Sequence, residues 1–295
     1  MGRYTGPCVA ALIAVTYSCW PDGGLKDGII TARLVFFCGW VTALSTGLGT
    51  LPFCVLSELN GQRWASYSNC VAAGMMLAAS LELILEGIAS ESSENYSLIG
   101  YPGIERVLMG ALLGFGFVHA AKHLLHSDSA EPLEQLMEMD KMKARQVSLI
   151  ILVMTMHSAT EGVGIGVSFG GKMGAKLGTF VSASLAVHNI PEGLAVALTL
   201  IPRGMSKMDA ALCSIFTSLP QPLLSVPAYY FVEEFAIMLP IGLGFSAGAM
   251  VWIACVELIP EALEDGRMRR LTMLGVVGTA FVLMIASQEV LRVAL

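Results

Sequence analysis

Residues 147–169 read VSLIILVMTMHSATEGVGIGVSF and residues 176–200 read KLGTFVSASLAVHNIPEGLAVALTL, and these two consecutive apolar stretches decide the fold. As a helix, each is long enough to cross the roughly 30 Å hydrocarbon layer of a bilayer. Each also carries a histidine and a glutamate four positions apart, which places the two side chains on one helix face. These pairs are His157 with Glu161 and His188 with Glu192. Two neighbouring crossings are therefore expected to bring two imidazoles and two carboxylates together.

The composition places the whole chain in a membrane. Its 295 residues are 55% apolar and only 14% charged, whereas soluble domains carry roughly a quarter charged residues. The pattern predicts an all-α, polytopic, multi-pass membrane protein whose short connections hold the helices in one bundle. Eight crossings are predicted, at 34–57, 67–88, 104–125, 147–169, 176–200, 209–231, 236–259 and 271–291. Basic residues form no stripe with interleaved aromatics, so no nucleic-acid partner is expected.

Two segments stand apart from these crossings. Residues 1–30 hold a short apolar stretch that is marginal for spanning, and they are interpreted as either an N-terminal leader or an extra apolar segment. The transmembrane domain is predicted to cover 31–295. Its one substantial hydrophilic connection, 127–146, is expected to be a solvated cytosolic loop, because charge runs are usually exposed.

Lysine and arginine set the orientation, since inner loops of membrane proteins carry an excess of both. With the first crossing running inward, the inner side holds Arg63, Lys122, Lys141, Lys143, Arg145, Arg203, Lys207, Arg267, Arg269 and Arg270. The outer connections hold Arg106, Lys172 and Lys176. This bias predicts both chain ends on the outer side. The sequence leaves the host membrane open among the plasma membrane, an endomembrane and a plastid envelope.

The residue types at the centre indicate a divalent cation as cargo. An ionisable group inside a spanning helix costs at least about 2.5 to 3.5 kcal/mol on insertion scales, and such groups usually serve a pathway or relay. Two imidazole nitrogens with two carboxylate oxygens suit Zn²⁺ and accept Fe²⁺, Mn²⁺, Co²⁺ or Cd²⁺. No resident cofactor is expected. A static hydrogen-bond network between the helices is the less favoured interpretation.

Four further glutamates are candidates for the entrance and the exit of such a pathway. Glu82 and Glu86 fall toward the outer side of the second crossing, and Glu257 and Glu261 fall toward the inner end of the seventh. For Glu86 and Glu261, solvation at the membrane interface explains the position equally well. Glu257 lies deeper and is the stronger metal-ligand candidate.

The motif His188-Asn189-Ile190-Pro191-Glu192-Gly193 resembles the signature of the ZIP (Zrt/Irt-like) family of divalent metal transporters. The resemblance continues in Ala247-Gly248-Ala249-Met250 and Glu257-Leu258-Ile259-Pro260-Glu261, and Thr217-Ser218-Leu219-Pro220-Gln221-Pro222 is most similar to the plant and algal branch. It implies an eight-helix bundle in a 3+2+3 inverted repeat, with the fourth and fifth helices central and metal moving toward the cytosol.

Family members often hold two metal ions, and the resemblance implies ligands for each. The first site would use His157, Glu161, His188 and Glu192. The second would add Ser158, Asn189 and Gln221 around the two glutamates. This chain departs from the family pattern there, because Ser158 and Gln221 replace the usual Asn and Glu and are poorer ligands. A single principal ion is therefore expected, with the second site weak or vacant.

Two alternatives to transport use the same four side chains. An intramembrane hydrolase would activate water on the metal, but the chain lacks His-Glu-x-x-His, so it is predicted not to be an enzyme. A metal sensor would bind the ion without moving it. The bilayer and the cation are the expected partners, and a homodimer is left open.

Overall fold

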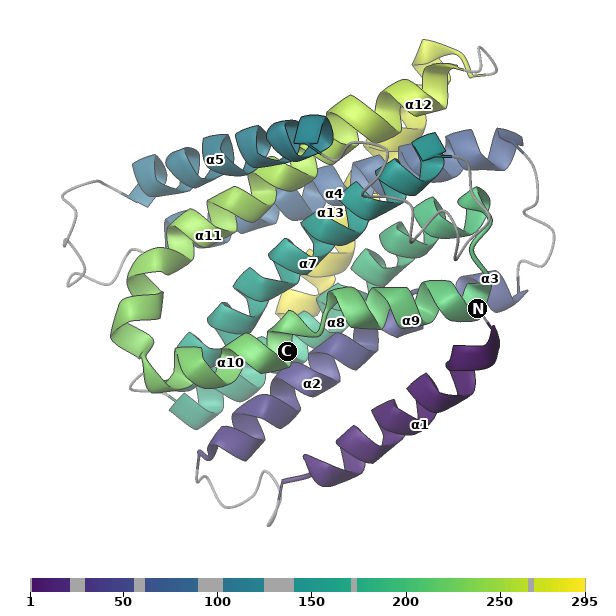
Figure 1. The fold of residues 1–295 in the computed structure, drawn as a ribbon. Helices are drawn as coiled ribbons and strands as arrows, with labels where there is room; N and C mark the ends of the chain where they lie inside the picture. Colours follow the sequence, from purple (N-terminus) through teal and green to yellow (C-terminus); the bar gives the residue numbers. More distant parts are fainter. Residues whose placement is uncertain are drawn as a thin grey trace.

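The computed structural model describes residues 2–21, 30–55, 62–89, 103–124, 141–170, 174–264 and 268–294. These residues form helices joined by short connections, without a strand among them (Figure 1). The helices are α1 (Gly2–Ser18), α2 (Ala32–Leu48), α3 (Pro52–Val55), α4 (Gln62–Ala89), α5 (Gly103–Leu124), α7 (Lys141–Gly170), α8 (Gly174–Leu200), α9 (Lys207–Thr217), α10 (Pro220–Tyr230), α11 (Val232–Trp252), α12 (Ile259–Glu264) and α13 (Arg270–Ala294). A 3₁₀ turn covers Ile201–Arg203, and a π-helical segment covers Ile253–Leu258.

The predicted all-α membrane architecture is confirmed. Six helical spans of the described chain are long and apolar enough to cross a bilayer: Ser66–Ala89, Ile104–His123, Gln146–Gly170, Gly174–Arg203, Glu234–Leu263 and Arg270–Val290. The remaining two predicted crossings differ in detail. The first, 34–57, is helical only to Leu48 before the short α3.

The crossing predicted at 209–231 is broken in the middle. α9 ends at Thr217, and α10 begins at Pro220. Proline lacks a backbone N–H and its ring clashes with the preceding turn, so it suits the first position of a new helix better than the interior of an old one. Two prolines in three residues, Pro220 and Pro222, therefore separate two half-helices where the sequence pattern alone predicted one.

The helices form two groups, which are distinguished by how closely their backbones approach. The first group contains α2, α7, α8, α9 and α10, and the second contains α4, α5, α11 and α13. Wherever a Cβ added to a described glycine would meet the backbone of another helix, that helix belongs to the same group. Between the groups, an added Cβ would meet side chains: that of Val232 on α11 from Gly170 on α7, and that of Thr160 on α7 from Gly242 on α11. At the described glycines, close backbone packing therefore occurs within each group, and the contacts across the boundary are with side chains.

Two close approaches show why glycine is needed in each group. A Cβ on Gly193 of α8 would meet the backbone of Thr46 on α2, and a Cβ on Gly114 of α5 would meet the backbone of Phe245 on α11. Figure 1 shows α5 lying alongside α11. Small residues at such positions allow helices in a bilayer to reach van der Waals contact along their length.

The packing pattern also reveals the inverted repeat. α2 packs on α8 as α10 packs on α7, and α5 packs on α11 as α13 packs on α4. This pattern is unchanged when corresponding helices are exchanged. The corresponding pairs are α2 with α9–α10, α4 with α11, α5 with α13, and α7 with α8. The 3+2+3 arrangement therefore appears in the packing, with the two motif-bearing helices between the repeats.

The two segments outside the predicted crossings are partly described. α1 lies at the edge of the bundle, where Nε1 of Trp40 donates to Oγ1 of Thr16 at 2.8 Å (Figure 1). Whether 1–30 is a leader or an additional segment stays a prediction. In the predicted loop 127–146, α7 already begins at Lys141, and residues 127–140 lie outside the described part of the chain.

Candidate metal centre

The two histidine–glutamate pairs converge between α7 and α8. One possible ligand atom from each of His157, Glu161, His188 and Glu192 can be chosen so that all four lie within 4.8 Å of one another. Each pair sits on one helix face because its members are four residues apart. His157, Glu161 and Glu192 are buried, and the His188 side chain is 15% exposed. The group of four is called the central cluster below.

Glu192 joins the two helices within the central cluster. Its Oε1 atom lies 2.6 Å from Nε2 of His157 and 3.2 Å from Nε2 of His188. Oε1 of Glu161 lies 3.6 Å from the same His157 nitrogen. Two buried carboxylates this close repel each other unless positive charge lies among them. The arrangement can therefore hold a divalent cation, with imidazole nitrogens and carboxylate oxygens facing a shared centre.

The residues expected at a second site form a hydrogen-bonded chain beside Glu161. Nε2 of Gln221 donates to Oε2 of Glu161. Nδ2 of Asn189 donates to Oε1 of Gln221 at 3.2 Å and to the backbone carbonyl of Thr42 at 3.0 Å. Ser158 is buried on α7. Gln221 thus directs amide hydrogens toward Glu161. These hydrogens carry partial positive charge and would repel a cation placed between the two side chains.

Glu257 lies outside the central cluster. Its Oε1 is 2.6 Å from Nζ of Lys122 on α5, and Nε2 of Gln146 on α7 donates to its Oε2 at 3.4 Å. Nζ of Lys122 also lies 5.3 Å from the ring centre of Trp252. In this arrangement the carboxylate is engaged by a cationic side chain.

A second ion pair lies near the end of α8. Arg203 is buried and pairs with Glu261, and its Nη1 donates to the carbonyl of Thr199 and, at 3.3 Å, to Oδ1 of Asn69. Nδ2 of Asn69 in turn donates to Glu261 at 3.0 Å. These contacts join the end of α8 to α4 and α12. The end of the bundle that contains them is called the Arg203 end, and the opposite end, where α4 finishes at Ala89, is called the Ala89 end.

Two side chains from the second helix group contact His188. Oε2 of Glu82 on α4 lies 3.5 Å from Nδ1 of His188, and Nε2 of Gln288 on α13 lies 2.9 Å from the same nitrogen. The sequence predicted Glu82 on the outer side of its crossing, but it gave no partner for it. Gln288 was missed. The available signal was an amide beside Glu289 near the end of a largely apolar crossing.

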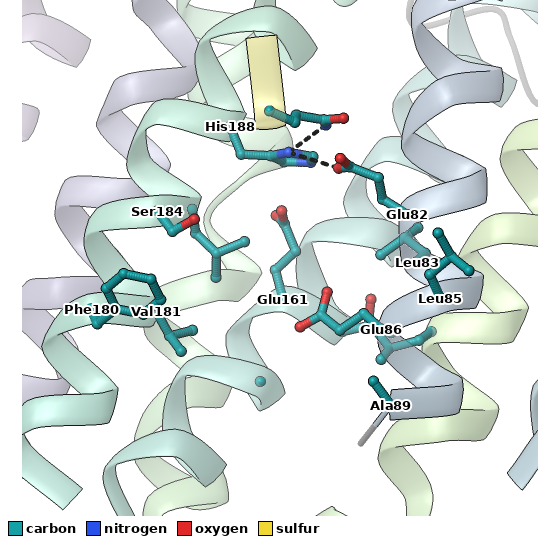
Figure 2. A pocket seen from close by; sticks show the side chains of 15 residues that line it. Glu82, Leu83, Leu85, Glu86, Ala89, Glu161, Phe180, Val181, Ser184 and His188 are labelled. Atoms are coloured by element: carbon teal, nitrogen blue, oxygen red, sulfur yellow. Dashed lines mark hydrogen bonds and ion pairs between the residues drawn. The ribbon is translucent and has the colours of Figure 1, made fainter. Parts of the chain in front are cut away.

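A cavity of about 440 Å³ leads to the central cluster. Glu161 and His188 line it, together with Glu82, Glu86 and Ala89 of α4. Figure 2 shows Glu161 and His188 on one side of this space and the α4 glutamates on the other. Because the lining continues to Ala89, the last residue of α4, the cavity extends from the cluster toward the Ala89 end.

The fold and the site define a multi-pass membrane protein with a buried imidazole–carboxylate cluster. A cavity between its helices extends to this cluster. The profile of the ZIP Zinc transporter family matches residues 119–286. The chain belongs to the ZIP family.

Curated relatives agree with this assignment. A putative zinc transporter of Arabidopsis thaliana is 41% identical over 249 residues, which are 84% of this chain and 37% of the relative. Zinc transporter GufA of Myxococcus xanthus is 30% identical over 228 residues, which are 77% of this chain and 88% of the relative. Zinc transporter ZIPB of Bordetella bronchiseptica is 32% identical over 204 residues, which are 66% of this chain and 62% of the relative.

Proposed function

We propose that this protein carries Zn²⁺, or a related divalent cation such as Fe²⁺, Mn²⁺ or Cd²⁺, across a membrane toward the cytosol. The observation that carries the proposal is the central cluster, in which two imidazoles and two carboxylates from adjacent crossings meet beside a cavity. Zinc transport by the named relatives and the donor set point to the same cargo.

The direction follows from charge and from which end is open. The lysine and arginine bias puts the Arg203 end on the cytosolic side and the Ala89 end on the outer side. The cavity reaches the cluster from the Ala89 end. At the Arg203 end, two contacts join the first group to the segment that continues α11: Arg203 pairs with Glu261, and Nε2 of Gln146 on α7 donates to Oε2 of Glu257 at 3.4 Å. These features support an arrangement that receives the cation from outside.

Transport requires the cluster to become accessible from the Arg203 end. All four members of the central cluster belong to α7 and α8, and hence to the first helix group. At the described glycines that face the second group, an added Cβ would meet side chains and not backbone, which supports this boundary as the place where relative movement costs least. Movement of one group against the other would separate Arg203 from Glu261 and Gln146 from Glu257 at the Arg203 end, and it would close the cavity at the Ala89 end.

We further propose that one principal ion is carried at a time. Glu161 accepts a hydrogen bond from Gln221, and Gln221 accepts one from Asn189. An amide that donates into the carboxylate occupies the place at which a second cation would need an oxygen donor. The missing carboxylate on α10 leaves the second position without charge compensation.

The proposal is tested with purified protein in liposomes that contain a zinc-responsive dye. Wild-type protein should admit Zn²⁺, and His157→Ala, Glu161→Ala, His188→Ala and Glu192→Ala should each abolish flux at equal protein content. Glu105→Gln, which removes an exposed carboxylate from the first turn of α5, serves as the control and should retain flux. Saturable Zn²⁺ binding without flux would indicate a sensor, and substrate hydrolysis without flux would indicate an enzyme. Either result would overturn the transport proposal.

A further inference from the structure

His188 differs from His157 in the surroundings of Nδ1, the ring nitrogen that points away from Glu192. Both histidines direct Nε2 toward Glu192. Nδ1 of His157 is buried and has no hydrogen-bond partner. Nδ1 of His188 instead faces Glu82 (Figure 2) and Gln288, two polar groups from the second helix group. Only one of the two histidines is therefore contacted at Nδ1 by a carboxylate.

A neutral imidazole carries one proton, and its position decides which nitrogen can bind a cation. If Nε2 of His188 binds the metal through its lone pair, the proton must sit on Nδ1. Metal-binding histidines nearly always donate that second N–H to a carboxylate, a carbonyl or water, which fixes the ring and makes the binding nitrogen more basic. Oε2 of Glu82, 3.5 Å from Nδ1, is a carboxylate oxygen in this position.

Gln288 can support either position of the proton. With the proton on Nε2, that nitrogen donates to Glu192, and Nδ1 accepts from Nε2 of Gln288 at 2.9 Å. Oε1 of Gln288 is buried without a hydrogen-bond partner. Rotating the amide by half a turn exchanges its nitrogen and oxygen, so Oε1 would then accept from a protonated Nδ1. This rotation would satisfy the unpaired oxygen when the cation takes the place of the Nε2 proton.

We propose that Glu82 and Gln288 are positioning residues that accept the Nδ1–H of His188 and thereby strengthen its bond to the transported cation. The inference rests on the proposed function. Neither residue needs to touch the metal. Glu82 acts by holding the proton on Nδ1 and the ring toward Glu192, and Gln288 completes the same acceptor site from α13.

The location of these partners links cation affinity to the position of the helix groups. His188 is on α8 of the first group, whereas Glu82 is on α4 and Gln288 on α13, both in the second. Movement of the groups relative to each other would withdraw both acceptors from Nδ1. His188 would then bind the cation less tightly, which favours release on the far side. High affinity is thereby confined to the arrangement in which the cavity reaches the cluster from the Ala89 end.

The test measures the Zn²⁺ dissociation constant of the purified full chain by competition with a chelating dye. Glu82→Ala should weaken binding by about 10- to 100-fold, the usual effect of removing an acceptor behind a metal-binding histidine. Glu86→Gln is the matched control, because Glu86 lines the same cavity one helical turn away. It should change the constant by less than about 3-fold, since only general attraction of the cation is altered.

Rescue separates this role from a purely structural one. In the Glu82→Ala background, Gln288→Glu places a carboxylate from α13 beside the same nitrogen, and most of the lost affinity should return. X-ray absorption of bound zinc should show the same number of ligands with and without Glu82. Loss of a ligand in Glu82→Ala, equal weakening by Glu86→Gln, or failure of the rescue would overturn the inference.

A further variant distinguishes the two proposals. If His188→Ala binds Zn²⁺ as tightly as wild type, the central cluster is not the cation site and the proposed function fails. If His188→Ala weakens binding while Glu82→Ala does not, the cation site stands and only the positioning role is lost.

Discussion

Oε1 of Glu192 lies within 3.2 Å of the Nε2 atoms of both His157 and His188, so a single carboxylate oxygen on α8 joins the two helices of the metal centre. Of the two cluster histidines, Glu161 lies within 4 Å of His157 alone, at 3.6 Å, and it accepts a hydrogen bond from Gln221. The two glutamates occupy equivalent places in the sequence motifs and unequal places in the cluster. This asymmetry leads to the first prediction.

Glu192→Gln is expected to weaken Zn²⁺ binding more than Glu161→Gln. The first change removes the negative charge that faces both imidazoles, and the second leaves that charge in place. We expect a difference of about tenfold in the dissociation constant, corresponding to roughly 1.4 kcal/mol. Isothermal titration of the two purified variants measures it. Equal losses would show that both carboxylates bind the ion equivalently.

Gln221→Glu is expected to create a second metal position. The substitution replaces the amide that donates to Glu161 with a carboxylate, which adds an oxygen ligand and one negative charge. Metal analysis after equilibrium dialysis should give one Zn²⁺ per wild-type chain and two per variant chain. Gln221→Ala, which removes the amide without adding charge, should remain at one. Two ions already bound to wild-type protein would contradict the single-ion proposal.

Gly193→Ala is expected to destabilise the first helix group. A Cβ there would meet the backbone of Thr46, which cannot move aside as a side chain can. Overpacking of this kind costs about 1 to 3 kcal/mol, so the apparent Tm in detergent should fall. Gly164→Ala on α7 is the matched control, because a Cβ at that position would meet no atom of another described helix within 4 Å. The same Tm for both variants would show that the approach of α2 to α8 is not tight.

Arg203→Gln is expected to loosen the Arg203 end. It removes the cation that pairs with Glu261 and that ties the end of α8 to α4 and α12. Leaving a buried polar group without its partner costs about 1 to 3 kcal/mol. Hydrogen–deuterium exchange in Ile259–Glu264 should therefore speed up. Arg269→Gln, an exposed cation near the start of α13, should leave this exchange unchanged. Unchanged exchange in Arg203→Gln would remove the pair from the closure of this end.

Much of the site could be predicted because both motifs lie within helices. The i, i+4 spacing fixes His157 beside Glu161, and His188 beside Glu192, whatever the rest of the bundle does. Burial of four ionisable groups in apolar crossings then points to a cation between them. The break before Pro220 could also have been predicted from the sequence, since two prolines in three residues disfavour a continuous helix. The apolar pattern on both sides concealed it.

Hydropathy and residue spacing along one helix are local properties, so they suffice to predict that this chain crosses a membrane as helices and that two of those helices carry matched nitrogen and oxygen donors. Three further relationships follow from how the helices pack. Glu192 contacts both histidines, Gln221 donates its amide to Glu161, and Glu82 and Gln288 contact Nδ1 of His188. Apart from the contact of Glu192 with His188, four positions away, those relationships join residues 35 or more positions apart. They depend on the rotation and approach of separate helices, which backbone contacts at glycines such as Gly193 fix and which no periodicity in the chain records.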